Sequence, residues 1–111
     1  MAFDQHLAQR IRDVLSEESG VTEKRMFGGL AFLLDGRLAL AAGNHGGLLL
    51  RNDPADVETH VSHAHVSRFE MRGRPMDGWL HVDDAAVDDE DGLRRWVAVG
   101  VTYARSLGPR D

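Results

Sequence analysis

The apolar residues of this chain change their spacing near residue 20, and this change restricts the folds that the chain can adopt. Before it, residues 4–18 carry apolar side chains at the three- and four-residue intervals of an amphipathic helix. Asp4 caps the expected start of that helix, and Gly20 follows its end. Over residues 22–52 the apolar side chains instead follow the spacing of strands. A helix that leads into strands predicts an α+β fold.

Turn signals divide the strand-like region into separate strands. Asp35-Gly36 lies between two apolar runs and predicts a two-residue hairpin. Gly28-Gly29 interrupts the first run, and we interpret it as a β-bulge that bends one long strand. Three consecutive antiparallel strands are therefore predicted, at residues 22–34, 37–42 and 48–51.

The second half of the chain predicts a helix, a hairpin and a further helix. Asp53-Pro54 opens a short helix that ends near Ser62, because aspartate is a good N-cap and proline suits the first helical position. The strands of the hairpin are predicted at residues 68–72 and 79–82. The last helix begins near Asp88, within a run of acidic residues that favours a helix N-terminus. The predicted order is α-β(3)-α-β(2)-α, with the helices packed on a five-stranded, mostly antiparallel sheet.

The composition argues against several classes of protein. With 111 residues the chain has room for one domain, which we expect to span residues 1–111. It contains no cysteine, which excludes disulfides, thiolate metal sites and a cysteine nucleophile, and which fits a cytoplasmic protein. The net charge of −5 argues against a general nucleic-acid binder. The longest apolar stretch, residues 30–34, is too short to cross a bilayer, so no membrane partner is expected.

Three motifs then occur in order along the chain. They are Glu23-Lys24-Arg25-Met26-Phe27-Gly28-Gly29, Phe69-Glu70-Met71-Arg72-Gly73-Arg74-Pro75-Met76-Asp77-Gly78-Trp79, and Tyr103-Ala104-Arg105 followed by Leu107-Gly108-Pro109. Together they resemble the signature stretches of the bacterial TfoX (Sxy) N-terminal domain family. The resemblance implies a fold similar to that of secretion chaperones. It also implies a regulator of natural competence and transcription, in the form of a stand-alone domain, because the chain ends at Asp111, where the family's second, helical domain would begin.

An arginine row is the main candidate for a binding surface. Arg68, Arg72 and Arg74 are two or four residues apart, so that an extended strand would point them to one side. Such a row could bind phosphates or an acidic protein surface. Glu70 lies in the middle of the row and weakens its positive field. The alternative is an ordinary solvated strand face.

Three histidines are the candidate metal ligands. His60 and His63 would share one face of a short helix, and His65 could join them from the following loop. Asp56 and Glu58 are near enough in sequence to complete such a site. The alternative is a set of exposed histidines, because spacing alone often matches by chance. The sequence therefore assigns no metal ligand, no cofactor and no catalytic residue.

The favoured function is a non-enzymatic protein-interaction module, with a regulatory role implied by the family resemblance. We expect an unidentified protein partner, and a homodimer is a further option. Two alternatives stay open. One is nucleic-acid binding through the arginine row, and the other is a small metal-dependent enzyme at His60, His63 and His65.

Overall fold

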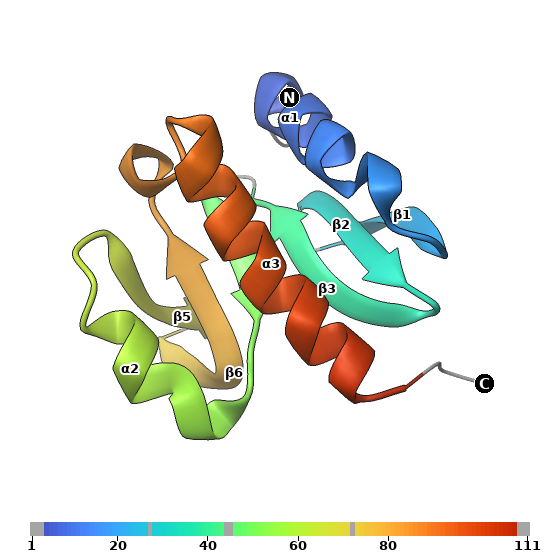
Figure 1. Ribbon diagram of the computed structural model, residues 1–111. Helices are drawn as coiled ribbons and strands as arrows, with labels where there is room; N and C mark the ends of the chain where they lie inside the picture. Colours follow the sequence, from blue (N-terminus) through green and yellow to red (C-terminus); the bar gives the residue numbers. More distant parts are fainter. Residues whose placement is uncertain (1–3, 27, 44–45, 72, 109–111) are drawn as a thin grey trace.

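The structure is a computed structural model that describes residues 4–26, 28–43, 46–71 and 73–108. Within these residues the helices are α1 (Gln5–Val14), α2 (Val57–Val61) and α3 (Glu90–Ser106), with 3₁₀-helices η1 (Leu15–Glu17), η2 (Pro54–Asp56) and η3 (Asp84–Ala86). The strands are β1 (Val21–Met26), β2 (Gly29–Leu34), β3 (Arg37–Ala42), β4 (Leu48–Arg51), β5 (Val66–Met71) and β6 (Arg74–Val82). The α+β fold predicted from the sequence is confirmed (Figure 1).

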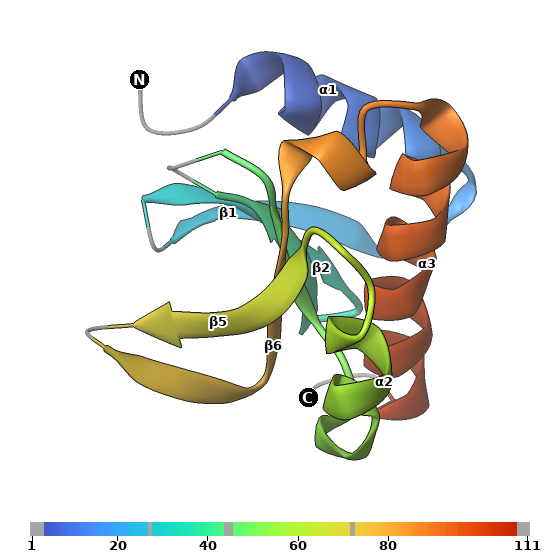
Figure 2. The same ribbon diagram turned by 90° about the vertical axis from the view of Figure 1, so that its left-hand side faces the viewer.

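The described strands form one antiparallel sheet in the order β1-β2-β3-β4-β6-β5. All three α-helices lie on the same face of this sheet (Figures 1 and 2). α3 packs along β3 and β4 in the middle of the sheet, while α2 packs on β5 and β6. The β1–β2 and β5–β6 hairpins extend from opposite edges of the sheet (Figure 2). α2 and α3 therefore lie side by side above its second half.

The sheet has six described strands rather than the predicted five, because residues 22–34 form a hairpin instead of one long strand. Met26 pairs with Gly29, so the chain reverses at the glycine pair that we interpreted as a bulge. Gly28 has φ 74°, which favours glycine, and a Cβ at Gly29 would overlap the carbonyl oxygen of Ala42 on β3. The bulge prediction is wrong because a glycine pair in an apolar run serves a tight turn equally well. Phe27 lies outside the described residues.

The β5–β6 hairpin is longer than predicted. The predicted strands at 68–72 and 79–82 extend to Val66–Met71 and Arg74–Val82, which shortens the expected turn at 73–78. The pairing is irregular between Arg68 and Glu70, so side-chain alternation does not run unbroken along β5. Arg74 pairs with Met71 across the two strands. A loop predicted from its glycines and proline is therefore mostly strand.

The main core fills the space between the helices and the sheet. Its fully buried side chains include Ile11, Phe32, Leu40, Leu50, Leu80, Leu93 and Val97. α3 approaches β3 closely at Gly100, where an added Cβ would lie 2.7 Å from the carbonyl oxygen of Ala39. The buried face of α3 thus packs on the sheet, and Gly100 sets the distance between the helix and β3.

The predicted helix starts are confirmed by their caps. Asp4 Oδ1 accepts hydrogen bonds from the backbone N–H groups of His6 and Leu7, at 2.9 and 3.1 Å. Asp53 caps η2, and Asp89 caps α3 through the N–H of Gly92 at 2.7 Å. Among the described residues there is no helix with both the length and the apolarity needed to cross a membrane.

Candidate binding pocket between α2 and α3

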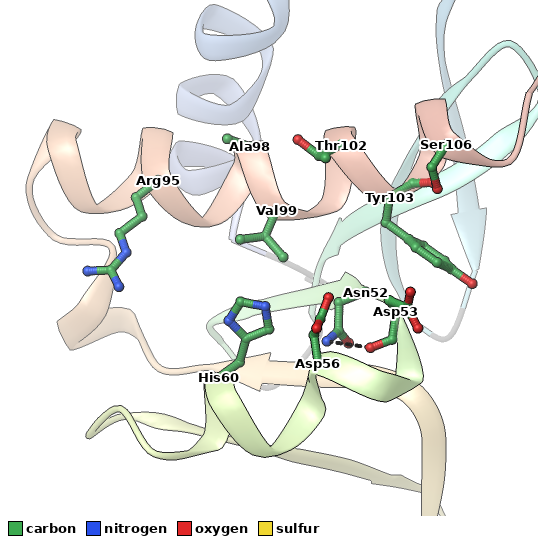
Figure 3. A pocket seen from close by; sticks show the side chains of 10 residues that line it. All are labelled: Asn52, Asp53, Asp56, His60, Arg95, Ala98, Val99, Thr102, Tyr103 and Ser106. Atoms are coloured by element: carbon green, nitrogen blue, oxygen red, sulfur yellow. Dashed lines mark hydrogen bonds between the residues drawn. The ribbon is translucent and has the colours of Figure 1, made fainter.

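A pocket of about 410 Å³ lies between α2 and α3. Residues of the β4–η2 connection, η2 and α2 form one wall, and residues of α3 form the other (Figure 3). The lining residues are Asn52, Asp53, Asp56, His60, Arg95, Ala98, Val99, Thr102, Tyr103 and Ser106. A volume of this size suits a small ligand or one or two side chains of a partner.

The local sequence explains why these side chains meet. The Asp53-Pro54 start directs η2 and α2 back along the sheet, and Val57 anchors α2 in the core. Asp56 and His60 then project toward α3 (Figure 3). On α3, the lining positions recur every three or four residues, so they form one stripe beside the buried face of the helix.

Asn52 is the one polar or charged side chain among the described residues that is fully buried, at 1% exposure. Its Nδ2 donates to the carbonyl oxygen of Asp53 at 3.2 Å, and its backbone N–H donates to the carbonyl oxygen of Gly78 at 2.9 Å. Its Oδ1, by contrast, is buried without a hydrogen-bond partner in the described part of the chain. A buried acceptor without a partner destabilises a fold by about 1–3 kcal/mol, so this atom needs an explanation.

The charges in the pocket are separated. Asp53 and Asp56 supply two exposed carboxylates beside Asn52, and neither forms an ion pair with another described residue. Arg95 lies at the other end (Figure 3). It donates toward His63 at 3.1 Å and lies over the ring of Trp96, 5.2 Å from its centroid. One end of the pocket therefore presents acceptors, and the other presents a cation.

Arg51 lies near two aromatic rings, one of which lines the pocket. Its guanidinium carbon lies 5.4 Å from the ring centroid of Tyr103 and 5.8 Å from that of Trp79. These are cation–π distances, and they connect β4 to both α3 and β6. The rings therefore accept a guanidinium in this region of the fold.

A comparison with protein families covers most of the chain. The model of the TfoX N-terminal domain matches residues 13–104. The chain belongs to the TfoX N-terminal domain family. No curated protein and no solved structure gives a significant match.

The three motifs of this TfoX N-terminal domain have structural roles. The first contains Gly28 and Gly29, which close the β1–β2 hairpin against β3. The second ends near Gly78, whose carbonyl holds the backbone of Asn52 at the pocket. In the third, Arg105 donates to the carboxylates of Asp35 and Glu18 at 2.8 and 3.1 Å. The motifs thus shape the sheet, the pocket wall and the connection between α3 and the β2–β3 turn.

The structure places two members of the predicted arginine row, Arg68 and Arg74, on different strands. Arg68 lies on β5 and forms an ion pair with Glu58 of α2. Arg74 begins β6, on the opposite side of the turn, and its side chain is exposed. Arg72 lies outside the described residues. A binding role for these arginines stays a prediction, but the single-strand geometry on which it rested does not hold for Arg74.

The three histidines do not converge. His60 and His63 both face Trp96 edge-on, with ring centroids 5.7 and 5.5 Å from it. His65 instead lies near Asp83, with 3.8 Å between Nδ1 and Oδ2. In the described ranges, no group of three or more histidine and acidic side chains is placed to hold a metal ion. The expectation that His65 could join the other two is therefore not met.

Sequence reasoning named Asp56 and His60 of this pocket, but only as members of a metal site, and it missed Asn52 and Tyr103 as site residues. Asn52 stands next to an obvious N-cap, and nothing local distinguishes it from a polar loop residue. Its burial depends on Gly78 and on α3, which are distant in the chain. Tyr103 belongs to a family motif, and that was the one signal that could have drawn attention to it.

Proposed function

We propose that this chain is a protein-interaction module with a regulatory role, and that its partner docks at the pocket between α2 and α3. Membership of the TfoX N-terminal domain family supports the regulatory role. More specifically, we propose that the chain regulates natural competence or transcription.

The buried Oδ1 of Asn52 is the observation that carries the docking site. A buried acceptor without a partner lowers the stability of the fold, because it has lost its hydrogen bonds to water. A ligand that donates a hydrogen bond to this atom would replace them. The pocket also opens on exposed side chains of α3, including Ala98 and Thr102. A partner that covers them would exclude water from the bond to Asn52.

Site-specific photo-crosslinking in the native host tests this function. A photoreactive amino acid at Thr102 lies in the pocket, while the same residue at Thr22 on β1 serves as a matched exposed control. We expect a discrete crosslinked partner from position 102 and none from position 22. Crosslinks from both positions, or from neither, contradict docking at this pocket.

A paired set of variants tests the regulatory role. Thr102→Trp fills the pocket with a large side chain, and Thr22→Trp makes the same change elsewhere. We expect transcript levels in cells carrying Thr102→Trp to match those of a deletion strain. The Thr22→Trp strain should match the wild type. Normal transcript levels with a filled pocket would contradict a regulatory role for this site.

A further inference from the structure

We propose that the pocket binds the guanidinium group of an arginine side chain presented by the partner protein. This inference rests on the proposed function, because it names the chemistry by which the partner is recognised. The charged head would lie at the end formed by Asn52, Asp53 and Asp56, and the aliphatic stem along Val99 and Tyr103.

Three side chains at this end of the pocket offer hydrogen-bond acceptors. Asn52 offers a buried Oδ1 without a partner, and Asp53 and Asp56 offer carboxylates that form no ion pair with described residues. Figure 3 shows the three side chains on the same wall. A carboxylate has no hydrogen to donate at neutral pH, so the occupant must supply several N–H donors and a positive charge.

A guanidinium fits these groups better than an ammonium does. Its donors lie in one plane and point in several directions, so that one group can reach an amide oxygen and a carboxylate together. It also stacks on aromatic rings, and the Tyr103 ring already has Arg51 near it at 5.4 Å. The remaining lining is mostly apolar, which suits the methylene stem of arginine.

The cations near the pocket are directed at other groups. Arg51 lies against the rings of Trp79 and Tyr103, and Arg95 lies against Trp96 with a contact to His63. Arg95 is also at the far end of the pocket from Asp53 (Figure 3). No cation of the described residues is therefore paired with the two carboxylates where the guanidinium would lie.

The test is a chemical-shift titration of the whole chain with Nα-acetyl-arginine amide and with its neutral isostere, Nα-acetyl-citrulline amide. We expect saturable shifts at Asn52, Asp56 and Tyr103, with a dissociation constant of about 1 mM for a ligand of this size. Citrulline amide should bind at least about tenfold more weakly, because it lacks the charge-assisted hydrogen bonds.

Two double variants test the assignment of the site. Asp53→Asn with Asp56→Asn removes both carboxylates, and asparagine preserves the N-cap of η2. This variant should bind arginine amide about tenfold more weakly than the wild type. Asp13→Asn with Asp88→Asn removes two exposed carboxylates outside the pocket and should leave binding unchanged.

Several results overturn the inference. They are equal binding of arginine and citrulline amides, shifts centred elsewhere on the molecule, and no saturable shift at ten times the expected constant. If position 102 crosslinks to a partner while arginine amide fails to bind, the docking function stands and the arginine chemistry fails. If arginine amide binds while no partner crosslinks, the pocket is a site for a free cationic small molecule, and the proposed function fails.

Discussion

The backbone N–H of Asn52 donates to the carbonyl oxygen of Gly78 at 2.9 Å, and this bond joins the start of the α2 region to the second family motif. Gly78 adopts φ 79°, a left-handed conformation that side chains disfavour. A Cβ there would lie 3.2 Å from the carbonyl oxygen of Asn52. The motif glycine therefore lets β6 approach the residue that defines the pocket.

Replacing Asn52 by leucine should separate stability from binding. Leucine keeps the branched shape but removes the buried acceptor, so we expect the free energy of unfolding to rise by about 1 kcal/mol. Asp53 keeps a donor for its carbonyl, because Asp56 also donates to it at 2.8 Å. Binding of arginine amide should be lost. Urea denaturation measures the stability change, and a clear loss of stability would show that Oδ1 has a partner within the fold.

Gly78→Ala should be more harmful than Gly73→Ala, although both glycines have nearly the same φ, 79° and 78°. At either position, alanine in this left-handed conformation should lower the free energy of unfolding by about 1–2 kcal/mol. Only at Gly78 does the new Cβ also meet the backbone of Asn52, because nothing lies within 4 Å of a Cβ at Gly73. Thermal unfolding compares the two variants. Chemical shifts of the pocket residues should change in Gly78→Ala and not in Gly73→Ala. Equal stabilities of the two variants would show that a side chain at position 78 does not contact the backbone of Asn52.

Gly100→Ala should lower stability in spite of alanine's higher helix propensity. Propensity alone would stabilise α3 by about 1 kcal/mol. The new Cβ would lie 2.7 Å from the carbonyl oxygen of Ala39, so the helix must move off β3, at a cost of about 1–3 kcal/mol. The net change is measured by urea denaturation. A stabilised variant would mean that α3 does not pack this closely.

Acidification should weaken the link between α1 and β1. Arg12 donates to both carboxylate oxygens of Glu23, at 2.7 and 2.9 Å, and these bonds hold the pKa of Glu23 below its usual value of about 4.3. A depressed pKa contributes stability above the unfolded value, and that contribution is lost as the pH falls through the folded value. Glu23→Gln should therefore lose less stability than the wild type between neutral pH and pH values below about 4.

Unfolding curves measured across that pH range provide the check. Glu17→Gln is the matched control, because Glu17 is an exposed glutamate for which the structure shows no ion pair among the described residues. Its acid response should follow that of the wild type. If Glu23→Gln also follows it, the pair with Arg12 does not persist in solution.

Local chemistry was sufficient to predict most of the elements. The helical spacing of α1 and α3, the caps Asp4 and Asp53, and the Asp35-Gly36 turn each depend on residues adjacent in the chain. Caps and turn residues form hydrogen bonds with the neighbouring backbone or suit its conformation. They therefore act in the same way wherever the segment lies in the fold.

Only the tertiary structure decided the rest. The chain turns at the glycine pair 28–29 because β1 and β2 pair with each other in the sheet. Gly29 lies so close to the carbonyl oxygen of Ala42 that a side chain would not fit there. Asn52 became a buried side chain at the pocket wall because Gly78, twenty-six residues away in the sequence, holds its backbone there. The sequence by itself determined most of the elements and the family, since both depend on short stretches of the chain. The pocket follows from how distant segments pack, because burial is a property of the assembled fold.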